Sequence, residues 1–336
     1  MAAATIFDRV VFCARETTKG TNGFATPNET FAATVTEVNA AITATPTNSD
    51  KQAVKVRTVK VAPSMTSIDR PTIKGSMGNS PNIIGKKMVQ VDIEFELKGS
   101  SAAGTAPEYT PMLEACGVST ALVATTSCTF APASTTTTLT QGVTLRVYHD
   151  GMVYDVTGCA GTATVDMTIG NIILVQATFQ GAYNAPAVQA IGALTSVPFD
   201  TTVPIVGDVA DVISDGATIK TAAFKMDLGN DVQEHYVTGD HQFSVANRNP
   251  TLTLTKDSIG TATEWSALAA GTNAAISGTF NAAGAAGNKL AFSGATARRS
   301  AVAYNERAER DILDVTYGLF ESAGGAGNDQ WSFQFT

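Results

Sequence analysis

The chain has 336 residues and a formal net charge of −8, and 44% of its residues are hydrophobic while only 15% are charged. This acidic balance argues against a protein that binds nucleic acid, because affinity for the phosphate backbone comes mainly from Lys and Arg. No apolar run approaches the roughly 20 residues that cross a bilayer, and the first residues lack the layout of a secretion signal. We therefore expect no membrane partner and folding in a cytoplasm.

Composition and length favour a β-rich chain with two domains. Thr, Ala, Gly and Ser dominate the sequence, and Thr favours strands. The length suffices for two domains of ordinary size, each with its own core. The four cysteines are scattered without a C-x-x-C pair, which predicts buried, reduced thiols: Cys13, Cys116, Cys128 and Cys159.

The first half opens with a short apolar stretch at residues 6–13. Residues 17–46 then read as an extended arm that orders against a neighbour, or as a loose terminal segment. Residues 54–61 predict a strand, and a slip in its alternation predicts a bulge near Arg57 and Thr58. Residues 62–88 form a long connection, which is uncommon in a compact domain and usually serves a purpose.

The most strongly two-faced strand is predicted at residues 89–97. Apolar and polar residues alternate strictly, so that one face is apolar and the other carries Asp92, Glu94 and Glu96. Helical spacing follows at Tyr109, Met112, Leu113 and Cys116. A strand of this kind followed by a short amphipathic helix makes one packing unit.

The first half continues with a hairpin at residues 143–156, whose turn is Asp150-Gly151. Strands are predicted next, at residues 163–169 and 172–183. Residues 184–204 contain three prolines and little periodicity, which places a domain boundary there. The expected units are residues 1–190 and 191–336.

The second half repeats the order of elements. Strands are predicted at residues 219–226 and 251–255, followed by a short helix with a Thr261–Glu264 capping box and an end at Gly271. Several strands then follow, the last of which carries Trp331, Phe333 and Phe335. The pattern indicates one duplicated domain.

Residues suited to catalysis or metal binding are few. His235 and His241, six apart, make a conceivable metal pair without an obvious third ligand. Asp92 and Glu94 are conceivable hydrolase carboxylates, but a solvated acidic face is favoured. We expect no enzyme, no metal and no cofactor.

The residues favour self-association instead. The C-terminal strand of Trp331, Phe333 and Phe335 is apolar, and such a strand at a sheet edge invites pairing with another chain. The alternative is that each edge is covered within the same molecule.

Five stretches resemble the tail tube (major tail) proteins of long-tailed, non-contractile, siphovirus-like bacteriophages, and their order along the chain is the specific feature. The most telling is GKKMVQVDIEFELKGSSAAGTAPEYTPMLEACG, at residues 85–117. The other stretches are residues 14–27, 150–186, 225–240 and 247–254.

This resemblance implies a mainly β fold of two tandem tail-tube-type β-sandwich or barrel modules, each with a short flanking α-helix. It implies trimeric rings that stack into a tube in the virion tail, assembled in the host cytoplasm. The tube is the conduit for DNA ejection, and genomic DNA passes through it without specific binding. The implied partners are the tape measure, tail terminator and distal tail proteins.

Two groups of site residues follow from the resemblance. Asp92, Glu94 and Glu96 are expected to face the lumen. Contacts between rings or subunits are expected from Arg70, Ile73, Ile83, Ile84, Trp331, Phe333 and Phe335. A secreted or surface β-sandwich that binds carbohydrate, as an adhesin does, is the alternative function.

Overall fold

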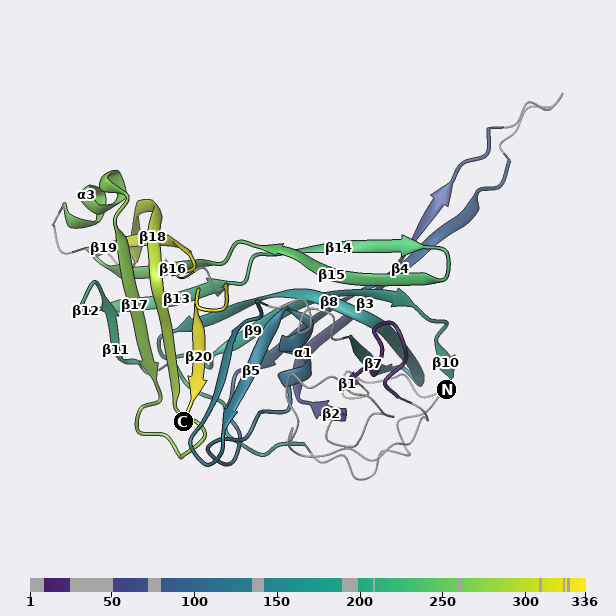
Figure 1. Cartoon of the computed structure of the whole chain (residues 1–336), viewed down its shortest axis with the longest axis horizontal. Coiled ribbons are helices and arrows are strands. Elements are labelled where there is room, and N and C mark those ends of the chain that lie inside the picture. The colour runs from purple at the N-terminus through teal and green to yellow at the C-terminus, as the bar shows by residue number, and fades with distance from the viewer. Residues whose placement is uncertain are drawn as a thin grey trace.

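The computed structural model describes residues 9–24, 51–71, 80–134, 142–188, 199–207, 209–258, 262–307, 310–322, 324 and 327–336. The fold is mainly β, as expected, and every pairing between its strands is antiparallel (Figure 1). Among these residues, no helix has the length and apolar character needed to cross a membrane.

Ten strands and one helix make up the first half of the described chain. The helix is α1 (Thr110–Ala115), which lies between β4 and β5 in the sequence. The strands are β1 (Val10–Arg15), β2 (Lys51–Val54), β3 (Val56–Ile68), β4 (Ile83–Glu96), β5 (Val118–Val123), β6 (Ser127–Pro132), β7 (Val143–His149), β8 (Met152–Thr168), β9 (Leu174–Tyr183) and β10 (Ala187–Val188).

The second half contains the helix α3 (Thr263–Ala270), between β16 and β17. Its strands are β11 (Val209–Ser214), β12 (Ala217–Ile219), β13 (Thr221–Asp227), β14 (Asn230–Val237), β15 (Asp240–Arg248), β16 (Thr251–Asp257), β17 (Asn273–Phe280), β18 (Leu290–Arg307), β19 (Arg310–Leu319) and β20 (Ser332–Phe335).

The two halves follow the same order of strand pairings. In the first half the order is β2-β1-β7-β8-β9-β4-β3. In the second half it is β12-β11-β17-β18-β19-β16-β13. Each helix comes at the corresponding place in the sequence, directly after β4 in one half and after β16 in the other.

The pairing of β8 with β13 joins the halves edge to edge. Eight strands thereby form one continuous sheet in the order β3-β4-β9-β8-β13-β16-β19-β18, which we call the long sheet. Side chains of paired residues lie on the same face, so rows can be followed across the strands. One row is apolar and buried throughout: Phe95, Val175, Val165, Met226, Leu252 and Tyr317.

Two long strands connect the long sheet to the strands that lie beyond it. β8 pairs with β7 near its start and with β13 near its end, and its pairing with β9 shifts between Thr157 and Ala160. β18 likewise pairs with β17 near its start and with β19 toward its end, with a shift between Arg299 and Ala301. Such bulges bend a strand and allow it to turn from one sheet layer into another.

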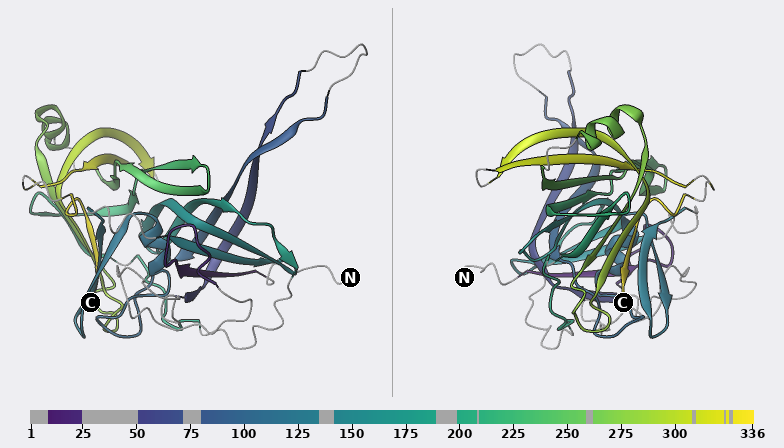
Figure 2. Two further views of the ribbon diagram at one scale, coloured as in Figure 1. Left: turned by 45° about the vertical axis from the view of Figure 1, so that its right-hand side comes forward. Right: turned by 90° about the vertical axis from the view of Figure 1, so that its left-hand side faces the viewer.

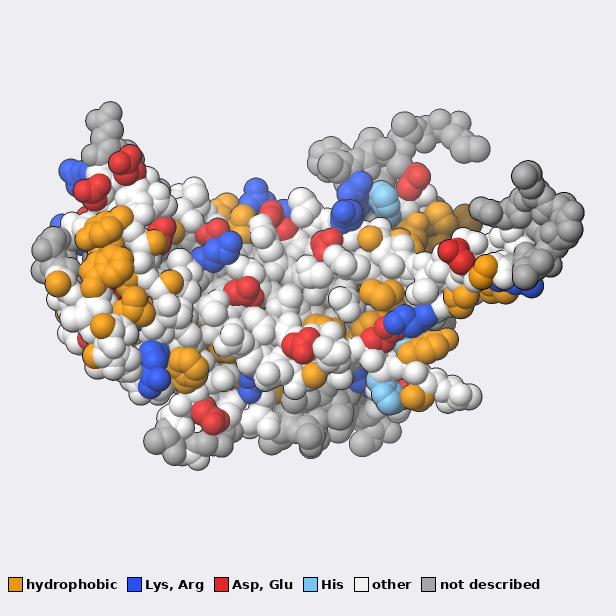
Figure 3. Space-filling view, turned by 90° about the horizontal axis from the view of Figure 1, so that it is seen from above, with side chains coloured by type: hydrophobic (Ala, Val, Ile, Leu, Met, Phe, Trp, Pro, Cys, Tyr) orange, Lys and Arg blue, Asp and Glu red, His pale blue; other side chains and the backbone are white. Residues whose placement is uncertain are grey.

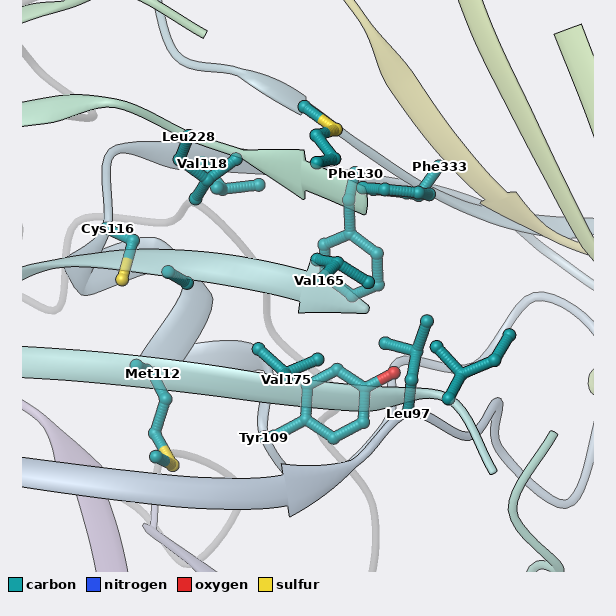
Figure 4. Close-up of a cluster of buried hydrophobic side chains, with 14 of the residues drawn as sticks. Leu97, Tyr109, Met112, Cys116, Val118, Phe130, Val165, Val175, Leu228 and Phe333 are labelled. Atoms are coloured by element: carbon teal, nitrogen blue, oxygen red, sulfur yellow. The ribbon is translucent and has the colours of Figure 1, made fainter. Parts of the chain in front are cut away.

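One large hydrophobic cluster runs through both halves, and a smaller one around Phe12 and Tyr148 lies in the first half. One cluster of buried side chains includes Val165 and Phe130 from the first half and Phe333 and Phe335 from the second. Figure 4 shows Phe130 of β6 beside Phe333 of β20, facing the strands that carry Val165 and Val175. β20 of the second half pairs with β6 of the first, so this cluster is continuous between the halves.

Several local predictions are confirmed by the backbone. The register of β3 shifts between Val56 and Thr58, where the bulge was expected. Asp150 and Gly151 have φ of 54° and 71°, as a tight two-residue hairpin turn requires. α3 is followed by Gly271 in the left-handed region, with φ of 63°.

The predicted capping box is wrong. The residue that precedes α3 as its N-cap is Ala262, which makes no side-chain cap, and Thr261 lies outside the described residues. Glu264 instead turns toward the sheet, where its carboxylate accepts hydrogen bonds from Lys256 and Arg299. Two buried cations thus compete successfully for the carboxylate that a capping box needs.

Each helix is held to the sheets by one buried glutamate. Glu114 of α1 accepts two hydrogen bonds from Arg15 of β1, with N–O distances of 2.7 and 2.9 Å, and both side chains are buried. Glu264 of α3 contacts Lys256 and Arg299, and Arg299 also bonds Asp215 at 2.7 Å. Such pairs fix a helix in one orientation, and breaking them leaves an unpaired buried charge.

We expect Glu114→Ala to lower the free energy of unfolding by about 3–5 kcal/mol, because the buried guanidinium of Arg15 then loses the carboxylate that accepts its two hydrogen bonds. Denaturant titration of the monomer measures this loss. Replacing both partners together, in Arg15→Met/Glu114→Leu, should recover most of it. An equal loss in the single and the double variant would contradict this account.

We expect α3 to loosen at low pH. Partial burial raises the pKa of Glu264, but hydrogen bonds from Arg299 and Lys256 lower it by more, so that its pKa in the folded protein lies below the ordinary value. The stability contributed by this carboxylate is present above the ordinary pKa of about 4.3 and is lost as pH falls through the lower folded value.

Fluorescence of Trp265 on α3, measured with Trp331→Phe in all samples, reports this transition. Glu264→Gln should show the acid signal already at pH 7, whereas the exposed control Glu321→Gln should behave as the parent. An identical acid transition in all three proteins would contradict the assignment.

Candidate assembly surface

The polar face of the long sheet carries the three acidic residues singled out in the sequence. Asp92, Glu94 and Glu96 lie on β4 opposite the core, and all three are partly exposed. Their row-mates on neighbouring strands are also polar. The row through Glu94 reads Thr58, Glu94, Gln176, Thr164, Asp227 and Thr251 across six strands.

The acidic groups on this face are held by neighbouring side chains. Asp92 accepts hydrogen bonds from Gln90 at 2.9 Å and from Thr178 at 3.0 Å. Glu94 accepts one from Gln176 at 3.1 Å, and Arg57 lies 3.7 Å from it. These partners fix the carboxylates on the surface as acceptors.

The same face continues over the second half with fewer charges. Thr255 donates to Asp314 at 2.6 Å, and the hydroxyls of Thr253 and Thr316 lie 3.4 Å apart. The surface is therefore a threonine-rich sheet with dispersed acids.

The outer edge of β3 is one end of the long sheet. Among the described residues, no strand pairs with this edge. Arg9 lies beside it and donates from Nη1 to the carbonyl of Val59 at 3.2 Å, while its Nε is buried without a hydrogen-bond partner within the described part of the chain. An open pocket of about 530 Å³ follows the edge and is lined by Arg9, Val59, Lys60 and their neighbours.

The other end of the long sheet is the last part of β18. Beyond Arg298, where pairing with β17 stops, the described strands leave the outer edge of β18 uncovered. Tyr304 there is 63% exposed, and its ring lies 5.7 Å from that of Trp265. Figure 3 shows hydrophobic side chains gathered at the end of the molecule that carries α3.

A long hairpin of β3 and β4 projects from the body, as Figures 1 and 2 show. We call its outer part, residues 64–71 and 80–88, the arm. Ile83 and Ile84 are about half exposed on the arm, and Ile83 pairs with the equally exposed Ile68. Arg70 is exposed at the outer limit of the described arm, and Ile73 lies outside the described residues.

The C-terminal strand does not offer an open edge. β20 pairs with β18 on one side and with β6 on the other. Trp331, Phe333 and Phe335 are buried in the core of the same chain, so the expectation that this strand is an uncovered edge is wrong. Alternation identifies a strand but not its neighbours, which are fixed by residues far away in the sequence.

Part of the expected N-terminal arm folds onto its own chain. Phe24 is buried, and the guanidinium of Arg146 stacks 4.4 Å from the centre of its ring. Glu16 accepts hydrogen bonds from the backbone of Gly20 and Gly158, and burial raises its pKa. The remaining residues of this stretch, 25–50, lie outside the described part.

Groups suited to metal binding do not gather in the described residues, where no cluster of three His, Cys, Asp or Glu side chains could hold a metal ion. His235 and His241 lie on different strands of the β14–β15 hairpin, opposite Gln242 and Tyr236, so the expectation that one strand places both on one face is wrong. All four cysteines are buried free thiols, and burial raises the pKa of Cys128 to about 12.

Sequence reasoning missed the two open ends of the long sheet. Tyr304 is one aromatic residue in a Thr- and Ala-rich chain, and only the pairing of β18 shows that it is uncovered. The sequence predicts strands in this part of the chain but carries no signal for which of their edges stay unpaired.

Comparison with known proteins agrees with this geometry. No curated protein matches the chain. The family model described as phage tail tube protein matches residues 7–318, which is nearly the whole chain. A structural component of the virion tail accords with a long polar sheet whose two ends are left uncovered by the described strands. The chain therefore belongs to the phage tail tube protein family.

Proposed function

We propose that this protein forms rings of three copies that stack into the tail tube, the conduit for DNA ejection into the host. The observation that carries the proposal is the edge pairing of β8 with β13, because no described strand covers the same two types of edge at the ends of the long sheet. In this proposal residues 1–190 and 191–336 are copies of one module, and the contact between modules inside the chain is repeated between chains.

The correspondence between the halves follows from how the strands end. The backbone N–H of Leu97 donates to the carbonyl of Ile173 at 2.9 Å, just past the β4–β9 pairing. The backbone N–H of Ser258 donates to the carbonyl of Asp311 at 3.3 Å, just past the β16–β19 pairing. Val175 stands two residues after Ile173, and Leu313 stands two residues after Asp311, so these two residues correspond. Val165 pairs with Val175 and Tyr304 pairs with Leu313, and therefore Val165 corresponds to Tyr304.

Leu252 and Val91 also correspond, since each stands six residues before Ser258 and Leu97, respectively. Met226 of β13 pairs with Leu252 and Val61 of β3 pairs with Val91, so Met226 corresponds to Val61. Inside the chain Met226 pairs with Val165, which is 5% exposed. Between chains, Tyr304 of one copy then pairs with Val61 of the next and is buried by it.

The register also supplies a partner for Arg9. Phe224 pairs with Met167 inside the chain. By the same count, Phe224 corresponds to Val59 and Met167 corresponds to Glu306. Glu306 of one copy would then lie opposite Val59 of the next, beside the guanidinium whose Nε is buried without a partner in the described protomer. Opposite charges satisfy the buried donor.

The contact surfaces of the closed ring are heterologous, and such contacts form a ring when the rotation closes. Stacking along the axis would use the arms, whose exposed Ile83, Ile84 and Arg70 face solvent in the protomer. The tape measure, tail terminator and distal tail proteins would meet the tube at its interior or at its two ends, and assembly would take place in the host cytoplasm.

The polar face of the long sheet would line the lumen. Asp92, Glu94 and Glu96 there would repel phosphate, and the strand register places the exposed cations Lys60 and Lys225 singly among them. A wall of this kind holds DNA weakly at every point, so that DNA slides without specific binding.

We expect wild-type protein to form rings or tubes of uniform width in negative-stain micrographs, and Tyr304→Asp to remain monomeric. The substitution places a charge where the neighbouring Val61 must pack. Tyr236→Asp is the matched control, because Tyr236 is 59% exposed on the β14–β15 hairpin. Tubes formed by Tyr304→Asp, or a wild-type protein that stays solitary at high concentration, would overturn the proposal.

We expect Glu94→Lys tubes to retain double-stranded DNA that wild-type tubes release, with retention falling steeply as salt is raised. The control is Glu321→Lys, which makes the same charge change at an exposed site off the long sheet. Co-sedimentation of short DNA with assembled tubes measures retention. Equal retention by the two variants would remove Glu94 from the lumen.

A further inference from the structure

The segment that precedes β11 fills a gap in the first half. The backbone of Ile205 donates to Leu97 at 3.1 Å and accepts from Ile173 at 3.0 Å, and its side chain is fully buried. The backbone N–H of Gly207 then donates to the carbonyl of Asn171 at 2.7 Å. The connection between the halves thus seats as an added strand where β4 and β9 end.

The corresponding place in the second half is open. Ser258 and Asp311, which match Leu97 and Ile173, line an open pocket of about 690 Å³ together with Thr218, Ile219, Lys220, Lys256, Asp257 and Arg310. No described residue of the chain is seated there as Ile205 is in the first half.

The segment that precedes β1 matches the segment that precedes β11. Ile6 and Phe7 stand four and three residues before β1, and Ile205 and Val206 stand four and three residues before β11. The hydrogen bonds of Ile205 and Gly207 use backbone atoms, so the polar lining of the second pocket does not prevent the same pattern of hydrogen bonds.

The position of Arg9 shows which copy can supply this segment. Arg9 contacts Val59 on the outer edge of β3, the edge that pairs with β18 of the neighbouring copy in the proposed ring. The pocket lies at the far end of the same molecule, where Figure 1 places β12 and β19 away from β1. The neighbour's β18 leads directly to Arg310 and Asp311 at its pocket.

We propose that residues 1–8 of one copy bind in the Ser258–Asp311 pocket of the next copy and add a strand beside Asp311. This inference rests on the proposed function, since it needs copies that meet at β3 and β18. It makes the N-terminal residues a clasp between subunits of one ring, with the connection between the halves as its model inside the chain.

Disulfide crosslinking between two single variants tests the proposal. Ile6→Cys and Ser258→Cys proteins are mixed, co-assembled and oxidised, so that a bond between these positions can form only between chains. Adjacent strands bring Cα atoms close enough for a disulfide, and the native cysteines are buried. We expect a covalent dimer of about twice the 34.8 kDa chain mass.

The matched control mixes Ile6→Cys with Ser266→Cys, an exposed serine on α3, and should give no more dimer than either variant alone. Rings or tubes without the Ile6–Ser258 crosslink would overturn the clasp and leave the tube function standing. A bond formed only within one chain, in the double variant, would also overturn it. Absence of any ring or tube in the wild-type protein would overturn both proposals.

Discussion

Antiparallel pairing between β8 and β13 is the interaction on which this architecture depends. Five paired residues set the register, from Ala223 opposite Thr168 to Asp227 opposite Thr164. Because side chains alternate between faces, a slip of one residue would carry Phe224 and Met226 to the polar side. One short contact therefore determines that eight strands share one apolar and one polar face.

Buried charge is tolerated in this fold because it is paired with a charge of opposite sign. Each helix covers the apolar side of strands that carry arginine or lysine, and a helical glutamate neutralises that charge where water is excluded. Glu114 with Arg15, and Glu264 with Lys256 and Arg299, use different strands for the same purpose. The helices are too short to be stable alone, so these contacts and the core beneath them hold them in place.

Local sequence signals predicted much of the fold. The alternation over residues 89–97, the bulge near Thr58 and the Asp150-Gly151 turn each depend on neighbours in the chain, and each is found in the structure. The acidic face of β4 was predicted for the same reason, because period-two alternation is sufficient to place Asp92 and Glu94 on one side.

Features that depend on distant residues were not predictable in this way. Nothing near Phe333 indicates that β6 lies beside it, and nothing near Glu264 indicates Arg299. Tyr304 became a candidate contact only when both edges of β18 were accounted for. Its importance comes from pairing order, which a single sequence does not carry.

The bent strands β8 and β18 have a mechanical consequence. Each is one continuous backbone that belongs to the long sheet on one side of its bulge and pairs with other strands, β7 or β17, on the other side. A force that pulls the long sheet away from these other strands, along β8 or β18, is therefore carried by the covalent backbone rather than by side-chain contacts between layers. We expect a tube built as proposed to bend first at the bulges near Gly158 and Ser300, where the ladder of hydrogen bonds is interrupted.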